Sequence, residues 1–507
     1  MKKELLFIAL VASTAVLAQK KAPVEKFAAT ISPKELKTKL SVIAGPGMEG
    51  RETATEDQRK AAAYIESFFK KIGLEPGAGE NKYQMAYPVY QDSLAGSGFS
   101  VNNNPLVFGK DYDVLRASLT NGNFSAKNIV FAAYGSTDSL NNDFDGLDVK
   151  DKWVMVLEQK PGYVSDDMYA QYHSYFVSAK AAAAKTKGAA GVIVVTKNAN
   201  ADFGKSLKGD MYLQQTKAHK PVVLVNVAAA NTLLGTSGKN LDELAALTHG
   251  VYKTALALQL QTITNNLHST NVIGVLPGTD KKGEYVFVTG HYDHLGKKDS
   301  VIYYGADDDG SGTTGVLQIA QAFVDAKKKG YAPRRTMIFM AVSGEEKGLW
   351  GSEYYTDNPT VSLDSTSADL NIDMIGRIDT ERKLPDTTNY VYVIGHDKLS
   401  SDLQKINEAA NKYTGLTLDY KYDDPADPNR IYYRSDHFNF ARKGVPILFF
   451  YDGMLQADYH KPTDTVDKIN FELMAKRAQM IFYTAWDIAN RDEILKRDMP
   501  LNMANAQ

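Results

Sequence analysis

The apolar positions near the start of the chain recur with the spacing of amphipathic helices. Ser32-Pro33-Lys34-Glu35 has the form of a capping box with proline at the first helical position, so a helix is predicted to begin here. A second helix is predicted from about Glu56 to Ile72, and Gly73 is suited to end it. The apolar positions behind these predictions are Leu36, Leu40, Ile43, Ile65, Phe68 and Phe69.

From about residue 87 to residue 262 the pattern changes to short strands separated by turns. Two continuous apolar runs, Trp153 to Leu157 and Gly191 to Val195, predict buried strands. The alanine-rich segment between them, Ser178 to Lys187, has helical propensity. We therefore predict a small α/β unit within a mainly β segment.

From Asn271 onward, apolar strands alternate with helices. The predicted strands are Tyr285 to Val288, Thr336 to Val342, Leu370 to Met374, Tyr390 to Ile394 and Pro446 to Phe450, and the predicted helices are Thr313 to Lys328, Ser400 to Tyr413 and Phe471 to Asn490. This alternation predicts an α/β domain with a mostly parallel central sheet flanked by helices. In such sheets, ligands bind at the carboxyl ends of the strands.

Length, charge and cysteine content narrow the class of protein. A chain of 507 residues is too long for one ordinary hydrophobic core, so two domains, or one large domain with an insertion, are expected. The 58 basic and 60 acidic residues form no long run of one sign, which argues against nucleic acid or a charged membrane surface as partner. The absence of cysteine excludes thiolate zinc sites and cysteine nucleophiles.

The first residues have the three parts of a secretory signal peptide. Met1-Lys2-Lys3 is basic, Leu5 to Leu17 is apolar, and Ala18 offers a small residue for cleavage. The apolar run is shorter than the roughly 20 residues of a membrane span. We expect residues 1–18 to direct export to the periplasm or the medium, and no membrane span elsewhere.

Five groups of polar residues lie at or near the ends of the predicted strands of the last part. The first strand runs into Thr289 to Gly296, where His291 and Asp293 fall on the same side by alternation, so that Asp293 is suited to orient a metal-bound His291. Next, Gly305 to Gly312 contains three successive aspartates, which repel one another unless a cation or a helix start compensates them. An acidic solvated turn is the alternative interpretation.

Adjacent acids follow the next strand. In Ser343-Gly344-Glu345-Glu346, one glutamate can bind metal while the other stays free as a general base. A lone aspartate, Asp373, then interrupts an apolar strand, and His460 follows the strand ending at Phe450, with Asp464 close by. A buried unpaired carboxylate is expensive, so Asp373 needs a partner.

Together these residues form a cysteine-free set of imidazole and carboxylate donors. Such donors suit zinc best, with manganese or cobalt as tolerated substitutes. Five protein ligands are too many for one open catalytic zinc, which typically has three. One carboxylate shared by two ions would account for the number.

At these motifs the sequence resembles the dizinc aminopeptidase family, which includes bacterial leucyl aminopeptidases and, more distantly, glutamate carboxypeptidase. The resemblance covers about Asn271 to Asn490 and implies the phosphorylase/hydrolase-like fold of zinc exopeptidases. It implies two zinc ions per chain, one held by His291 and Asp373 and the other by Glu346 and His460. It further implies that Asp308 bridges the ions, that Glu345 is the base and that Asp293 orients His291.

The same resemblance extends to Ser435-Asp436-His437. It implies that Tyr432, by its spacing, stabilises the tetrahedral intermediate, with Tyr433 as the alternative. From the residues alone, His437 is predicted to be structural, with Asp436 as its partner. His294 and His396 are not predicted to be ligands.

The middle segment resembles the protease-associated domain, a module often inserted into exported peptidases, through Val149 to Leu157 and Ala182 to Val195. The expected organisation is a signal peptide at 1–18, N-terminal helices of the peptidase domain at 19–86, the insert at 87–262, the peptidase domain at 263–495 and a tail at 496–507.

The expected function is removal of N-terminal residues from peptides by a water that two zincs activate and from which Glu345 takes a proton. A carboxypeptidase is the first alternative and would need a basic pocket, for which Arg377, Arg430 and Arg434 are candidates. A glutaminyl cyclase would work with one zinc, and an inactive binding protein would have lost ligands, whereas all are present here. The sequence leaves the oligomeric state and the preferred side chain open.

Overall fold

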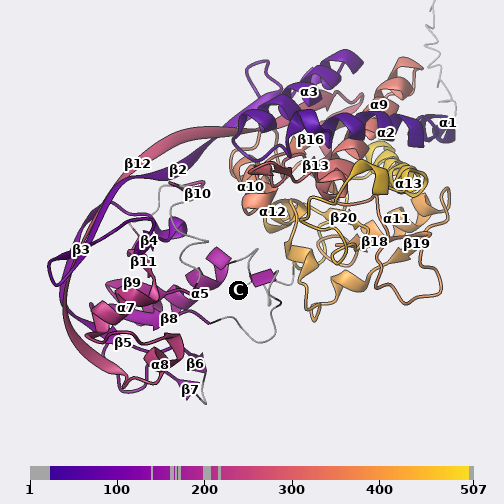
Figure 1. The fold of residues 1–507 in the computed structure, drawn as a ribbon. Helices are drawn as coiled ribbons and strands as arrows, with labels where there is room; N and C mark the ends of the chain where they lie inside the picture. Colours follow the sequence, from indigo (N-terminus) through magenta and orange to yellow (C-terminus); the bar gives the residue numbers. More distant parts are fainter. Residues whose placement is uncertain are drawn as a thin grey trace, which may run out of the picture. The chain divides into compact units, whose positions relative to one another are not determined.

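The structure is a computed structural model that describes residues 23–138, 141–159, 165, 168–169, 173–197, 207–214 and 219–501. The predicted signal peptide, residues 1–18, lies outside the described residues. The chain divides into two units: unit 1 comprises the segments up to Met85 and from Thr270 onward, and unit 2 comprises Ala86–Ser269 (Figure 1).

Unit 1 is built on a mostly parallel sheet. Its strand order is β19-β18-β20-β17-β13-β16-β12. Neighbours β17, β13 and β16 run parallel, as do β20 with β17 and β19 with β18, whereas β12 and β18 are antiparallel to β16 and β20. The strands are β12 (Gly250–Leu276, of which the last residues join this sheet), β13 (Lys281–His291), β16 (Arg335–Val342), β17 (Thr366–Ile372), β18 (Tyr390–Ile394), β19 (Thr417–Asp419) and β20 (Ile447–Tyr451), with the short β1 (Glu75–Pro76) pairing to β12.

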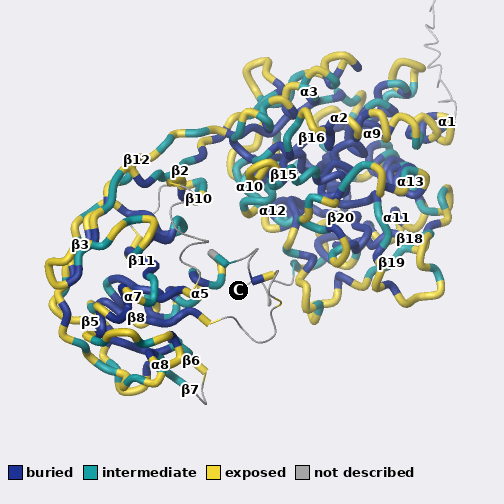
Figure 2. Tube along the Cα trace, in the orientation of Figure 1, coloured by how far each residue is buried: buried dark blue, intermediate teal, exposed yellow. Residues whose placement is uncertain are grey.

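Helices cover both faces of this sheet, and its strands β16, β17, β18 and β20 are buried along their whole length (Figure 2). Alternation decides which face each side chain meets: Val286 and Val288 of β13 pack in one core cluster and Phe287 packs in the other. The helices of the first face are α1 (Val24–Ala28), α2 (Pro33–Ile43), α3 (Glu56–Ile72), α9 (Gly312–Lys328), α11 (Leu403–Asn411) and α13 (Phe471–Asn490), and those of the second are α10 (Trp350–Asp357) and α12 (His437–Arg442).

The start of the first N-terminal helix and the end of the second lie where the sequence indicates. Ser32 caps α2 by accepting a hydrogen bond from the Glu35 backbone N–H at 3.3 Å. The reciprocal half of the capping box does not form, because the Glu35 side chain pairs with Lys39 one turn later, at 3.0 Å. Helix α3 has the predicted bounds and ends at Gly73, whose φ of 94° is the left-handed conformation that favours glycine.

Unit 2 is mainly β with a parallel core. Its strand order, starting from the first part of β12, is β12-β5-β8-β9-β11-β4, in which β5, β8, β9 and β11 run parallel. Strand β2 pairs antiparallel with β3 and with β10. The bounds are β2 (Gln84–Val101), β3 (Asn104–Leu106), β4 (Tyr112–Val114), β5 (Gly122–Phe131), β6 (Thr137–Asp138), β7 (Asn141–Asn142), β8 (Trp153–Leu157), α5 (His173–Thr186), β9 (Gly191–Val195), β10 (Lys208–Tyr212), β11 (Val222–Val225), α7 (Val227–Leu234) and α8 (Leu241–Ala245).

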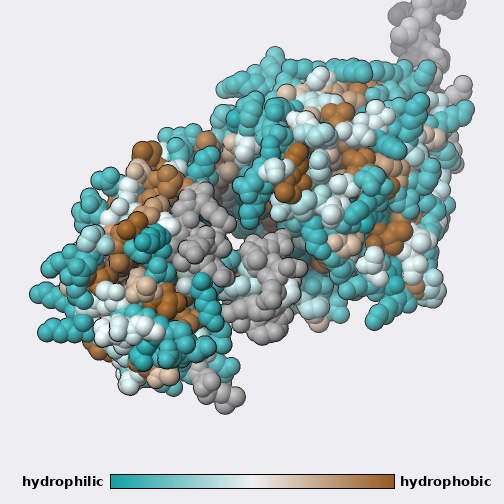
Figure 3. Space-filling view, in the orientation of Figure 1, coloured by the Kyte–Doolittle hydropathy of each residue, from teal (hydrophilic) through white to brown (hydrophobic). Residues whose placement is uncertain are grey.

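The predicted fold class is confirmed: an α/β domain on a mostly parallel sheet is accompanied by a mainly β module. On the surface seen in Figure 3, hydrophobic residues form scattered patches among hydrophilic ones in each unit. Among the described residues, no helix combines the length and the apolarity that a membrane crossing requires.

A buried arginine joins the N-terminal segment to the main sheet. The Arg51 side chain has no solvent exposure, and its guanidinium donates to the carbonyls of Tyr292 at 2.6 Å, Tyr304 at 2.5 Å and Gly305 at 2.6 Å. These carbonyls belong to the segment after β13 and to the start of the aspartate-rich turn. Arg51 therefore holds two chain segments whose side chains are candidate site residues.

We predict that Arg51→Ala lowers the free energy of unfolding by about 3 kcal/mol or more, because each carbonyl left without a donor costs about 1–3 kcal/mol. Chemical denaturation of the metal-free protein measures the change. The matched control is Arg59→Ala, since the half-exposed Arg59 pairs with exposed Glu56 and contributes under about 1 kcal/mol. Equal effects of the two substitutions would contradict the anchoring role of Arg51.

Candidate metal centre

The predicted donors lie at the carboxyl edge of the unit 1 sheet. Strands β13, β16, β17 and β20 are mutually parallel neighbours in that sheet, so the segments that follow them meet at one edge. The donors are His291 at the end of β13, Asp308 in the turn Ala306–Ser311 before α9, Glu345 and Glu346 in the short helix Glu345–Lys347 after β16, Asp373 directly after β17, and His460 after β20.

A first group forms around His291. Its Nε2 lies 3.3 Å from Asp308 Oδ1, 3.5 Å from Asp373 Oδ1 and 3.9 Å from Glu345 Oε2. Ligand atoms about 2.0–2.1 Å from a tetrahedral zinc are about 3.3 Å apart. The spacing of His291, Asp308 and Asp373 therefore fits three ligands of one ion.

A second group forms around His460. Its Nε2 lies 3.1 Å from Asp308 Oδ2 and 3.0 Å from Glu346 Oε2. Asp308 thus turns one carboxylate oxygen towards each histidine. This is the arrangement that a carboxylate shared between two ions needs.

The structure adds His294, which the sequence did not indicate as a ligand. Its ring is fully buried, and Nδ1 lies 2.7 Å from Glu346 Oε1 and 3.9 Å from Asp308 Oδ2. Strand alternation assigns His294 to the side opposite His291, but β13 ends at His291 and alternation stops there. The signal in the sequence was the spacing His-x-Asp-His itself.

Buried polar atoms without a hydrogen-bond partner gather at these groups. Within the described residues they include His291 Nε2, both ring nitrogens of His294, Asp308 Oδ2 and Glu346 Oε1. Buried polar atoms are normally paired, so a cluster of unpaired ones calls for a missing partner. All are nitrogen or carboxylate oxygen donors, and the set therefore fits zinc.

The electrostatics of the site favour a bound cation. Burial by itself would lower the pKa of His460, but the negative charges of Glu346 and Asp308 outweigh it and raise that pKa to about 11. Burial likewise opposes ionisation of Asp308, yet its close contacts with His291 and His460 hold its pKa well below the ordinary range. Protons on the histidines thus neutralise the carboxylates, and bound cations would take over that role.

Glu345 differs from Glu346 in its surroundings. Burial raises the pKa of Glu345 well above its ordinary range, although the charge of His291 acts against this. For Glu346, the charges of His460 and His294 outweigh burial and the Asp308 charge, and its pKa falls to about 2. Glu346 is therefore the carboxylate paired with histidines, and Glu345 is the one whose surroundings favour the protonated form.

Within the aspartate-rich turn, the three carboxylates have separate partners. Asp307 accepts from the Gly376 backbone N–H at 2.8 Å, and Asp309 accepts from the N–H of Gly312 at 2.9 Å, in the first turn of α9. Only Asp308 faces the histidines. The turn is held by Asp464, whose carboxylate accepts the backbone N–H groups of Asp307 and Asp308 at 3.0–3.2 Å.

Asp293 lies behind His291, and its backbone makes the closest contact. His291 Nδ1 is 3.1 Å from the Asp293 carbonyl oxygen and 3.6 Å from its carboxylate. The carboxylate accepts from Thr53 Oγ1 at 2.5 Å and from the Glu345 backbone N–H at 3.3 Å. Asp293 therefore connects the His291 ring, the Glu345 backbone and the N-terminal segment.

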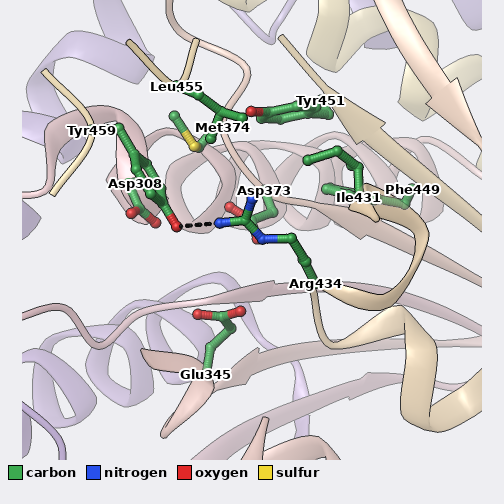
Figure 4. A pocket seen from close by; sticks show the side chains of 10 residues that line it. All are labelled: Asp308, Glu345, Asp373, Met374, Ile431, Arg434, Phe449, Tyr451, Leu455 and Tyr459. Carbon is green, nitrogen blue, oxygen red and sulfur yellow. Dashed lines mark hydrogen bonds between the residues drawn. The ribbon is translucent and has the colours of Figure 1, made fainter. Parts of the chain in front are cut away.

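A small pocket opens beside the donors (Figure 4). Glu345 and Arg434 both line it, and Arg434 donates to the Tyr459 hydroxyl, which faces it, at 3.1 Å. Among the described residues, Arg434 has no carboxylate partner within ion-pair distance. The lining residues are Asp308, Glu345, Asp373, Met374, Ile431, Arg434, Phe449, Tyr451, Leu455 and Tyr459.

Tyr432 and His437 pack behind this pocket. Tyr432 is not among the lining residues, and its buried hydroxyl has no hydrogen-bond partner within the described chain. His437 Nε2 lies 2.7 Å from the Tyr432 carbonyl oxygen, and burial lowers its pKa to about 4. The expected pairing with Asp436 is absent, because Asp436 instead accepts from Ser352. His437 is thus a structural residue with a different partner.

His396 lies in a separate group with Asp397 and Asp423. Lys398 Nζ lies 2.7 Å from Asp397 Oδ1 and 3.2 Å from Asp423 Oδ1. The lysine ammonium therefore occupies the place that a cation would take.

Comparison with known proteins identifies both parts of the chain. Residues 271–485 match the sequence model of peptidase family M28, and residues 115–233 match that of the PA domain. Both resemblances drawn from the sequence motifs are thereby confirmed.

Curated relatives share the peptidase part. A probable leucine aminopeptidase of Arthroderma otae is 28% identical over 246 residues, which is 47% of this chain and 63% of the relative. Aminopeptidase YwaD of Bacillus subtilis is 24% identical over 252 residues, which is 46% of this chain and 48% of its own length. The match thus spans less than two thirds of each of these relatives.

Solved structures share the fold across nearly the whole chain. An aminopeptidase from Aneurinibacillus sp. strain AM-1 has a TM-score of 0.56 at 18% identity, covering 94% of this chain and 99% of that one. The zinc aminopeptidase BSAP of Bacillus subtilis has a TM-score of 0.54 at 21% identity, covering 92% and 99%. At these identities the likeness concerns the fold. Residues 271–485 of this chain thus carry the match to peptidase family M28, and residues 115–233, which precede them, carry the match to the PA domain.

Proposed function

We propose that this protein is a zinc-dependent metallopeptidase that removes N-terminal residues from peptides. The observation that carries the proposal is the buried group of imidazole and carboxylate atoms that lack partners, beside a further carboxylate, Glu345, that faces a pocket. The names of the relatives, leucine aminopeptidase and zinc metalloprotease, support the same activity.

In this proposal two zinc ions bind between the sheet edge and the turn before α9. His291 and Asp373 would hold one ion, Glu346 and His460 would hold the other, and Asp308 would be shared between them. When bound, the zincs lower the pKa of a water and polarise the scissile carbonyl. Each carboxylate oxygen of Asp308 already has its own histidine, which supports the bridging assignment.

Glu345 acts as general base and then as general acid. Its buried carboxyl has a raised pKa, which suits a group that must take a proton and return it near neutral pH. Glu345 takes the proton of the attacking water and passes it to the leaving amine. Asp293 supports this step by accepting from the Glu345 backbone N–H and by holding His291. Tyr432 stays our prediction for the group that stabilises the tetrahedral intermediate.

The pocket supports an exopeptidase that accepts an apolar side chain. Its lining away from the carboxylates is mostly apolar, with Met374, Ile431, Phe449 and Leu455. The carboxylates on its other side suit a free N-terminal ammonium. An N-terminal apolar residue therefore satisfies both sides at once.

A carboxypeptidase is the second candidate, because Arg434 lines the same pocket without a carboxylate partner among the described residues. A guanidinium suits a substrate carboxylate. The other two arginines considered support this reading less: Arg377 pairs with Asp458 at 2.9 Å, and the Arg430 guanidinium lies 5.1 Å from the Tyr433 ring centre.

The remaining parts of the proposal concern the organisation of the chain. We propose that residues 1–18 are a signal peptide for export to the periplasm or the medium, that residues 87–262 are an insert, and that residues 19–86 and 263–495 form the peptidase domain. The segment 496–507 would be a tail. Peptides would be the substrates.

The variants Glu345→Gln and Glu346→Gln should distinguish the general base from the zinc ligand. We predict that Glu345→Gln keeps the wild-type zinc content while kcat falls by about 10²–10⁴-fold, the usual contribution of general acid–base catalysis. Glu346→Gln should instead lower the zinc content. Metal analysis and peptidase assays on both variants measure this, with exposed Glu472→Gln as control. Wild-type activity of Glu345→Gln would refute the assignment.

Zinc affinity of the metal-free protein should rise with pH. His460 keeps its proton up to a pKa of about 11, and zinc competes with that proton for Nε2. Loss of the proton as pH rises therefore favours zinc, by about tenfold per pH unit for each proton displaced. Chelator competition at pH 6, 7 and 8 tests this; an affinity independent of pH would contradict it.

Two classes of substrate distinguish an aminopeptidase from a carboxypeptidase. We predict that aminoacyl-nitroanilides with large apolar residues are hydrolysed and that N-blocked dipeptides are not. For the carboxypeptidase, the N-blocked dipeptides would be cleaved instead, and Arg434→Gln would raise KM for them about tenfold or more, since charge-assisted hydrogen bonds contribute about 1.5–3 kcal/mol.

A further inference from the structure

His294 meets the second group of donors in a way that hydrogen bonding does not explain. Its Nδ1 lies 2.7 Å from Glu346 Oε1, yet within the described residues neither atom has an aligned hydrogen bond. Both atoms are buried, and an unsatisfied buried polar atom is costly. Two lone-pair donors that converge in this way are suited to bind one cation together.

The fold keeps the His294 ring in this position. The residue pairs through its backbone with Glu52, and its ring has no solvent exposure. The Gly305 backbone lies directly against the ring, since a Cβ at Gly305 would stand 2.5 Å from His294 Cγ. On another side the His294 ring meets the His460 ring edge-on, with centres 5.9 Å apart. Little room remains for the imidazole to turn away.

The surrounding atoms form one set of four donors. Asp308 Oδ2 and Glu346 Oε2 lie 3.1 Å and 3.0 Å from His460 Nε2, and His294 Nδ1 lies 2.7 Å from the other Glu346 oxygen, Oε1, and 3.9 Å from Asp308 Oδ2. His294, Asp308 and Glu346 each offer an atom within 4.8 Å of the others. The first group, around His291, has three such residues and no second histidine.

We propose that His294 is a further zinc ligand, binding through Nδ1 beside Asp308, Glu346 and His460. The inference rests on the proposed function, because it assumes that this site holds zinc. Four protein ligands leave one position free when zinc becomes five-coordinate, so the ion can still meet a substrate. The two sites are then unequal: this ion has two imidazole ligands, and the ion at His291 and Asp373 has one.

The different numbers of imidazole ligands predict which zinc ion dissociates last. Since imidazole is a strong ligand for zinc, the site with His294 and His460 should fill first and empty last. Stepwise chelation of the holoenzyme should therefore remove the zinc at His291 before the other.

The competing role for His294 is to donate a hydrogen bond from Nδ1–H to Glu346 and so position that ligand. His294→Asn separates the roles, because the asparagine side-chain amide can donate from nearly the same place as Nδ1 but is a poor zinc ligand. A positioning role predicts that Asn preserves the affinity. A ligand role predicts that Asn and Ala variants lose it alike.

The first measurement needs no variant. X-ray absorption of the two-zinc wild-type protein counts imidazole ligands, and we expect about 1.5 per zinc, from three histidines over two ions, against about 1.0 for His291 and His460 alone. An average near 1.0 overturns the inference even if every His294 variant fails to fold.

The second measurement is zinc binding by His294→Ala and His294→Asn. Loss of a residue that only hydrogen-bonds to a metal ligand lowers metal affinity by about 10–100-fold. We expect both variants to lower the tighter of the two zinc affinities by more than this. The matched control is His396→Ala, since that histidine also contacts an aspartate but lies in a separate group. Thermal unfolding of the metal-free variants confirms that they fold. Tight zinc binding by His294→Asn overturns the inference.

The outcomes also separate this inference from the proposed function. If the wild-type protein binds no zinc, or is inactive with two zincs, the proposed function fails. If it binds two zincs and cleaves peptides while His294→Asn keeps the wild-type affinity, only the role of His294 fails.

Discussion

The arrangement of unit 1 depends on one buried carboxylate, Asp308, that faces two histidines at once. Each of its oxygens lies within 3.3 Å of an imidazole nitrogen, and the residue is almost fully buried. A carboxylate in such a place is stable only when positive charge compensates it. The histidines supply that charge through their raised pKa values when they carry protons, and cations would supply it otherwise. The geometry of the site therefore favours cation binding.

Much of the surrounding structure keeps Asp308 and its neighbours from relaxing into solvent. Asp464 fixes the backbone of the turn through two N–H groups, and Arg51 binds the carbonyl of Gly305, where that turn starts. Both contacts are made with backbone groups of the turn. Their effect is to hold a backbone whose side chains repel one another, which a loop without such partners would not do. Rigid support of this kind is what a site needs to present ligands before an ion arrives.

The sequence predicted most of the strands and the donors at their ends, because parallel strands bury runs of apolar residues and release polar ones at a common edge. Helix α13 and strands β8, β9 and β18 have the predicted bounds. Partners distant in sequence were not predictable: Arg51 contacts residues about 240–250 positions away, and Asp464 contacts Asp307 across 157 positions. The place of His294 beside Glu346 was not predictable from strand alternation, because β13 ends at His291. The partner of His437 was misassigned because neighbours in sequence need not be neighbours in space.

Glu345 and Glu346 show how adjacent identical residues acquire opposite properties. The short helix after β16 turns Glu346 towards His460 and His294, and their charges hold its pKa low. Glu345 faces the pocket and the single histidine His291, where burial dominates and the pKa rises. The hydrogen bond from the Glu345 N–H to Asp293 ties this orientation to the residue behind His291. The position of one peptide group, rather than side-chain chemistry, thus decides which glutamate is suited to bind an ion and which to move a proton.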